Sequence, residues 1–103
     1  MILITGSSGY IGSEIANYLE QKNIKYIGVD NQVYSSSKNI INKKKHFKID
    51  ISNNKIGKLI IKNKITTVIH CAALSYVLDA EKNKKRYIKN NIRKTKKFID
   101  LCK

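Results

Sequence analysis

The sequence predicts an α/β fold: a doubly wound parallel sheet of four strands in the order 3-2-1-4, with helices on both faces. Short apolar runs alternate along the chain with segments whose apolar residues recur at helical spacing. A glycine-rich turn joins the first apolar run to the first helical segment. The chain has 103 residues, of which 42% are hydrophobic, so we expect one domain with one modest core.

The first strand is predicted at residues 2–5, a short run rich in β-favouring side chains. A helix follows, because Ile11, Ile15 and Leu19 recur at a spacing that places them on one helical face. The second strand is predicted at residues 24–30.

Residues 31–45 are polar and are predicted to form a loop with room for one short helix. A third strand is expected at 46–50 and an amphipathic helix at 53–63. The run at 65–73 is apolar at its centre on both faces, which is typical of a buried parallel strand.

The last segment predicts a helix with one buried stripe. Its apolar and small side chains step by four, three, four and three residues, at Ile88, Ile92, Thr95, Ile99 and Cys102. The remaining surface is basic and is expected to face solvent, with a nucleic-acid-binding face as the alternative. That basic surface consists of Lys89, Arg93, Lys94, Lys96 and Lys97.

The chain carries a formal net charge of +14, from 21 basic and 7 acidic residues. Nineteen of the basic residues are lysine, and lysine, asparagine and isoleucine together make up 48 of the 103 residues. These three residues have A/T-rich codons, so a biased genome would produce this composition without selection for a basic surface. An anionic partner such as RNA is the competing explanation. Phosphate-binding proteins more often use arginine, and we therefore favour compositional bias.

No apolar run approaches the length of a membrane span, and no signal peptide is recognisable at the start of the chain. Two cysteines, Cys71 and Cys102, are too few for a disulfide scaffold and suit a reducing compartment. We therefore expect a cytoplasmic protein with no membrane partner.

Glycines at positions 6, 9 and 12 lie between the first strand and the first helix. Gly6 would permit the tight turn, Gly9 the close approach of a pyrophosphate, and Gly12 the close packing of the helix on the sheet. The N–H groups of Tyr10 and Ile11 would then face the phosphates at the positive end of the helix dipole. The alternative is a plain glycine-rich turn.

The second and third strands each end in an aspartate. Asp30 would accept hydrogen bonds from an adenosine ribose and repel a 2′-phosphate, which favours NAD over NADP. Asp50 would meet the adenine amino group, with Ile51 against the ring, or would simply cap the next helix.

Small residues follow the fourth strand, in the sequence His70-Cys71-Ala72-Ala73, and would let the backbone approach the nicotinamide ribose. Neither the histidines nor the cysteines show a recognised metal-ligand spacing, so no metal site is predicted. Cys71 is expected to be a buried, inert thiol.

The sequence resembles the extended short-chain dehydrogenase/reductases, and within them the NAD-dependent nucleotide-sugar epimerases and dehydratases of the UDP-glucose 4-epimerase type. The resemblance covers the whole chain and rests on five motifs in the family's order: TGSSGYIGSE, VDN, KIDI, VIHCAAL and the run at residues 87–92. It implies a Rossmann-like fold, NAD as the cofactor, and reversible oxidation of carbon 4 of a UDP-sugar.

The family's NAD contacts map onto the segments 10–11, 30–35, 50–51, 71–75 and 90–91. Together with the glycines, they give the predicted NAD-binding residues: Gly6, Gly9, Tyr10, Ile11, Gly12, Asp30, Asn31, Ser35, Asp50, Ile51, Cys71, Ala72, Ala73, Ser75, Asn90 and Asn91. The sequence departs from the family at Lys84, where proline is usual, at Lys94, where glycine is usual, and at Ser75, where a lysine often contacts the cofactor.

The family continues into a fifth strand, a helix with a catalytic Tyr-x-x-x-Lys motif and a sugar-nucleotide domain. We therefore expect residues 1–103 to be an incomplete NAD-binding domain without a catalytic residue, with the nucleotide sugar binding only in an intact parent protein. The matches Tyr18–Lys22 and Tyr34–Lys38 are expected by chance and lie away from the nicotinamide.

The favoured function is the NAD-binding portion of a nucleotide-sugar epimerase. The alternatives are a non-catalytic or regulatory NAD-binding module and a basic RNA-binding protein. The fourth strand would be an exposed apolar edge, through which the chain would self-associate.

Overall fold

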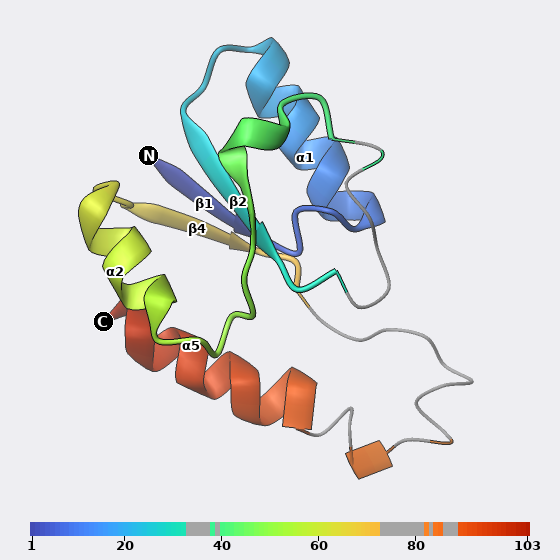
Figure 1. The fold of residues 1–103 in the computed structure, drawn as a ribbon, viewed down its shortest axis with the longest axis vertical. Helices are drawn as coiled ribbons and strands as arrows, with labels where there is room; N and C mark the ends of the chain where they lie inside the picture. Colours follow the sequence, from blue (N-terminus) through green and yellow to red (C-terminus); the bar gives the residue numbers. More distant parts are fainter. Residues whose placement is uncertain (33–37, 39, 73–81, 83, 86–88) are drawn as a thin grey trace.

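The protein forms an open sheet of four parallel strands with helices on both faces (Figure 1). The computed structural model describes residues 1–32, 38, 40–72, 82, 84–85 and 89–103. The strands are β1 (Ile2–Thr5), β2 (Tyr26–Asp30), β3 (His46–Lys48) and β4 (Thr67–His70). Their order is β3-β2-β1-β4, which confirms the predicted topology.

Three α-helices and two shorter turns complete the described fold. They are α1 (Tyr10–Gln21), the 3-10 turn η2 (Lys43–Lys45), α2 (Lys55–Lys62), the π-helical turn η3 (Lys89–Lys94) and α5 (Thr95–Cys102). β1 has the predicted bounds, whereas β2, β3, α2 and β4 lie one to three residues inside the predicted ranges at one end or both, since terminal residues leave the hydrogen-bonded ladder first. No helix in the described ranges is long and apolar enough to cross a bilayer.

The sheet register brings the carboxyl ends of the strands to one edge. Thr5 of β1 lies beside Val29 of β2 on one side and beside His70 of β4 on the other. Asp30 of β2 is in turn level with Lys48 of β3. The described residues that directly follow the four strands therefore lie at this edge, where doubly wound sheets bind their ligands.

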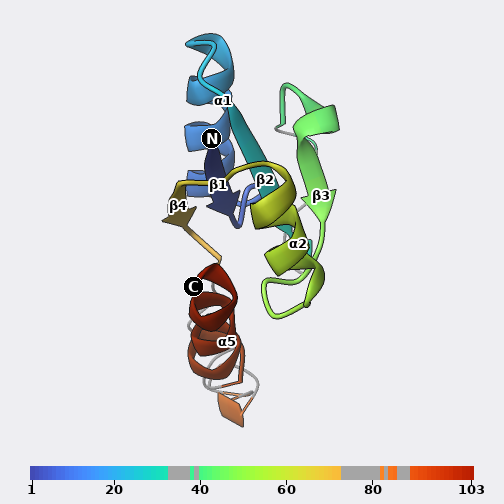
Figure 2. The same cartoon turned by 90° about the vertical axis from the view of Figure 1, so that its left-hand side faces the viewer.

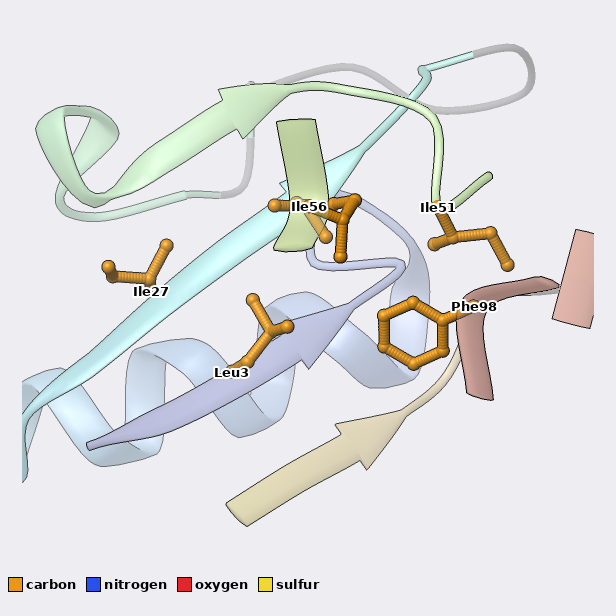
Figure 3. Packing of buried hydrophobic residues seen from close by; sticks show 6 residues of the cluster. Leu3, Ile27, Ile51, Ile56 and Phe98 are labelled. Carbon is orange, nitrogen blue, oxygen red and sulfur yellow. The ribbon is translucent and has the colours of Figure 1, made fainter. Parts of the chain in front are cut away.

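Alternating side chains of the strands divide the core into two layers. Leu3, Ile27 and Val29 pack with Ile56 of α2 and Phe98 of α5 on one face (Figure 3). On the other face, the buried residues are Ile4, Ala16, Leu19 and Tyr26, with α1 supplying two of them. The sheet thus lies between α1 and the pair formed by α2 and α5; in Figure 2, α2 lies in front of the strands and α5 below them. The alternation follows from the two-residue period of a strand.

The predicted buried stripe of the last helix is wrong. Ile92, Ile99 and Cys102 are exposed, whereas Phe98 is 3% exposed and Leu101 is partly buried. The buried residues Phe98 and Leu101 each lie one position before the predicted residues Ile99 and Cys102. Both pairs have the same helical spacing, so spacing alone could not distinguish them. Packing selected the stripe with the aromatic ring, which removes more apolar surface from water. The π-helical turn before α5 also breaks the period that would carry the pattern forward from Ile88.

Replacing Phe98 by alanine should lower the free energy of unfolding by about 3–5 kcal/mol, because it empties a buried aromatic site. Ile99, the neighbour of Phe98 on α5, is 50% exposed. Its replacement by alanine should therefore lower the free energy of unfolding by less than about 1 kcal/mol. Urea denaturation of the two variants makes the comparison. An equal loss in both would contradict the observed stripe.

Candidate nucleotide-binding site

The turn after β1 is the centre of the candidate site. The N–H groups of Gly6 and Ser7 both donate to the carbonyl of Val29, at 2.9 and 3.2 Å. The N–H of Gly9 donates to the carbonyl of Gly6 at 3.1 Å, which closes the turn before α1 begins. Backbone hydrogen bonds thus attach the glycine-rich turn to the end of β2.

Two of the three glycines in this turn have no room for a side chain. Gly6 has a φ of +69°, and a Cβ there would lie 2.8 Å from the backbone N of Ala72. A Cβ on Gly12 would overlap the carbonyl oxygen of Gly6. The turn therefore lies in direct contact with both the end of β4 and the first turn of α1.

The start of α1 is open to solvent. Tyr10 is 84% exposed and Ile11 is also exposed. Gly9 precedes the helix and supplies no side-chain cap, and the first turn holds no acidic residue. The N–H groups of this turn and the helix dipole are therefore available to an anion such as a pyrophosphate.

Asp30, at the end of β2, lies directly beside the glycine-rich turn. One carboxylate oxygen accepts from the N–H of Ser8 at 3.0 Å, and the other accepts from the N–H of Gln32 at 2.6 Å. Each oxygen keeps a further lone pair, so the carboxylate can also accept hydrogen bonds from two ribose hydroxyls.

Asp50 accepts four hydrogen bonds from the chain itself. The N–H and hydroxyl of Ser52 donate to Oδ1, at 2.9 and 2.6 Å. The Asn31 amide and the Lys94 ammonium donate to Oδ2, at 3.2 and 2.6 Å. Burial by itself would raise the pKa of Asp50, but these donors outweigh it and hold that pKa well below its usual range.

Three sequence-based expectations can be compared with these contacts. Lys94 was expected on a solvated surface, but it is half-buried and ion-paired, so that expectation is wrong. Asp50 was alternatively expected to cap the next helix, but α2 begins only at Lys55. The N–H of Lys55 donates to the side chain of Asn53. Helix capping at that end thus involves Asn53. Ile51 is buried in the first core layer.

A hydroxyl–imidazole pair joins β1 to β4 at the same edge. Thr5 Oγ1 accepts from the N–H groups of Cys71 and Ala72, at 3.1 and 3.2 Å. Its own proton is then free for Nδ1 of His70, 2.6 Å away. Burial lowers the pKa of His70 and raises that of the Cys71 thiol, which makes the thiol a weak nucleophile at neutral pH.

A second polar network was missed from the sequence. Ser7, fully buried in the glycine-rich turn, lies 2.9 Å from Nδ1 of His46, and the Tyr26 hydroxyl lies 3.4 Å from Nε2. Burial raises the pKa of Tyr26 to about 12 and lowers that of His46. No local pattern signals this network, because 39 residues separate Ser7 from His46.

The remaining predicted residues divide into two groups. Ser35, Ala73 and Ser75 lie outside the described residues. Asn90 and Asn91 belong to η3, on the same turn as Lys94. Within the described part of the chain, no three His, Cys, Asp or Glu side chains are arranged to hold a metal ion.

The structure describes only one of the two tyrosines in the Tyr-x-x-x-Lys matches. Tyr34 lies outside the described residues. Tyr18 is exposed near the end of α1, with the Lys22 ammonium 5.8 Å from its ring centre. This places Tyr18 on the helix that follows the glycine-rich turn, near the end farther from that turn.

Comparison with known proteins gives one consistent family. The NAD dependent epimerase/dehydratase family matches residues 2–103. The dTDP-D-glucose 4,6-dehydratase of Dictyostelium discoideum is 36% identical over an alignment 111 residues long, which covers 99% of this chain and 26% of that protein. The bifunctional protein GAL10 of Candida maltosa is 34% identical over 112 residues, covering 100% of this chain and 73% of that protein.

The fold has the same relatives. A UDP-glucose-4-epimerase from Stenotrophomonas maltophila, solved with bound NAD and formylated UDP-arabinopyranose, matches with a TM-score of 0.89 at 26% identity. The match covers 97% of this chain and 32% of that one. The chain thus spans about a third of that epimerase and about a quarter of the Dictyostelium dehydratase.

The two histidines predict a pH dependence of stability. Both imidazoles have a pKa below the ordinary value in the folded protein. As the pH falls, the two histidines are therefore protonated at a higher pH in the unfolded chain than in the folded protein. Their contribution is complete above about pH 6.5 and is lost as pH falls below it. Urea denaturation should therefore show lower stability at about pH 5.5 than at about pH 7.5. His46→Asn and His70→Asn should each reduce that difference, and an undiminished difference in both would refute the assignment.

Proposed function

Because this chain belongs to the NAD dependent epimerase/dehydratase family, as its motifs predicted, we propose that residues 1–103 bind NAD for a nucleotide-sugar epimerase acting on a UDP-sugar. The observation that carries the proposal is the contact between Asp30 and the glycine-rich turn. A carboxylate and an uncapped helix N-terminus lie side by side there, joined by the 3.0 Å bond from the N–H of Ser8. That combination suits a ribose next to a pyrophosphate.

The first half of the cofactor would lie over the start of α1. The N–H groups of Tyr10 and Ile11 would face the pyrophosphate, and Gly9 would leave its approach open. Asp30 would accept from the two adenosine ribose hydroxyls. The close packing at Gly6 and Gly12 supports this arrangement, because it holds the turn flat against the sheet edge.

The second half would extend toward the end of β4. Cys71 and Ala72 have small side chains, and Thr5 holds both of their N–H groups in place. We assign the nicotinamide ribose to this end, with Ala73 and Ser75 as further proposed contacts. Asn90 and Asn91, on the same turn as Lys94, are proposed NAD contacts that we assign to neither end.

The chemistry supplied by bound NAD is acceptance of a hydride from carbon 4 of the sugar. A general base must remove the hydroxyl proton at the same time, and a tyrosine with a lowered pKa has this role in the family. Tyr26 does not qualify, because it is buried in β2 and its pKa is raised to about 12. We therefore assign no general base among the described residues of this chain.

Cofactor selectivity tests Asp30. The protein should bind NAD at least about tenfold more tightly than NADP, because the carboxylate repels the 2′-phosphate and hydrogen-bonds the free hydroxyls. Asp30→Asn should reduce the preference while still accepting from the N–H of Ser8. Asp100→Asn, an exposed carboxylate on α5, is the matched control and should leave it unchanged. Isothermal titration gives both affinities, and equal affinity in the unmodified protein would remove the role of Asp30.

Turnover tests the assignment of the base. The purified 103-residue chain, incubated with NAD and UDP-galactose, should form no UDP-glucose above a protein-free blank, because loss of a general base costs about 10²–10⁴ in rate. Chromatography of the nucleotide sugars measures the product. Conversion that disappears in Tyr18→Phe or Tyr34→Phe would show that one of the two Tyr-x-x-x-Lys matches is catalytic.

A further inference from the structure

We propose that Lys94, through its ion pair with Asp50, sets the base selectivity of the dinucleotide site, so that the site admits a 6-oxo purine as well as adenine. The inference rests on the proposed function and specifies which bases the site accepts. It makes Lys94 a specificity-determining residue that the sequence alone assigned to solvated surface.

The first observation is that Asp50 has no spare acceptor. An ionised carboxylate offers about four lone-pair positions. Ser52 fills two through Oδ1, and Asn31 and Lys94 fill two through Oδ2. An amino group of a base can therefore bond to Asp50 only by taking the place of one of these donors, and the Lys94 ammonium, 2.6 Å from Oδ2, would be next to that amino group.

The second observation is that the pair is only partly covered. The side chains of Lys94 and Asp50 are 25% and 26% exposed, so both the ammonium and the carboxylate are accessible from solvent. Because the two groups are 2.6 Å apart, a molecule that contacts one of them lies next to the other.

The third observation connects the pair to the ribose site. Asn31, which donates to Asp50, follows directly after Asp30. Asp30 is thus connected to the ion pair through the peptide bond to Asn31 and the side-chain amide of Asn31, which donates to Asp50. A nucleotide whose ribose lies on Asp30 would place its base on the side of the sheet edge where Asp50 and Lys94 are located.

The chemistry of the two groups sets the selectivity. Adenine has a 6-amino donor beside the acceptor N1, whereas hypoxanthine has a 6-oxo acceptor beside the donor N1–H. A lone carboxylate accepts from the adenine amino group and repels a 6-oxo group. A carboxylate paired with an ammonium offers an acceptor and a donor side by side, and it therefore complements either edge.

The affinities of the purified protein for NAD and for nicotinamide hypoxanthine dinucleotide test the inference, measured by isothermal titration. The two Kd values should agree within about threefold in the unmodified protein. Lys94→Met keeps the aliphatic stem and removes the ammonium, and should favour NAD by about tenfold. Asp50→Asn keeps the ammonium and should shift the ratio in the opposite direction. Lys97→Met, an exposed lysine on α5, is the matched control and should leave the ratio unchanged.

The ratio of the two affinities separates recognition from a structural role. A change that merely loosened the fold would weaken both ligands together, and the melting temperature of each variant would report it. A strong preference for NAD in the unmodified protein that Lys94→Met leaves unchanged would overturn this inference alone. Failure of the unmodified protein to bind either dinucleotide would overturn the proposed function and this inference with it.

Discussion

The fit of one glycine-rich turn between two strand ends is the constraint on which the rest of the structure depends. Gly6 lies within contact distance of the backbone after β4, and its carbonyl oxygen lies against Gly12 at the start of α1. The same turn donates two hydrogen bonds to Val29 at the end of β2. Three elements are thus positioned by a segment of four residues, and any side chain at Gly6 or Gly12 would separate them.

Hydrogen bonds between buried polar side chains help to hold the glycine-rich turn in place. Ser7 and Thr5 are fully buried, and each is paired with an imidazole, Ser7 with His46 and Thr5 with His70. In the described residues, no buried side-chain nitrogen or oxygen lacks a hydrogen-bond partner. Unpaired polar groups in such positions would cost about 1–3 kcal/mol each, so the networks stabilise the turn as well as orient it.

Two of the many lysines form specific contacts within the fold. Lys45 pairs with Glu20 at 2.8 Å and lies 4.9 Å from the centre of the Tyr26 ring. Lys94 pairs with Asp50 and ties the turn before α5 to the loop after β3. The structural effect of each lysine thus depends on what lies within reach of its ammonium.

The sequence alone determined the position of the glycine-rich turn and the location of Asp30, because each depends on local periodicity or on residues close together in the chain. The strand order was predictable because doubly wound parallel sheets use right-handed crossovers in a small set of topologies. It could not determine which of two equally spaced stripes of the last helix is buried, since that choice depends on how Phe98 fits between the sheet and α2. It also could not place Lys94 beside Asp50, 44 residues away, or His46 beside Ser7. Contacts of this kind arise only when the sheet brings distant strand ends to one edge, and only the tertiary structure decides them.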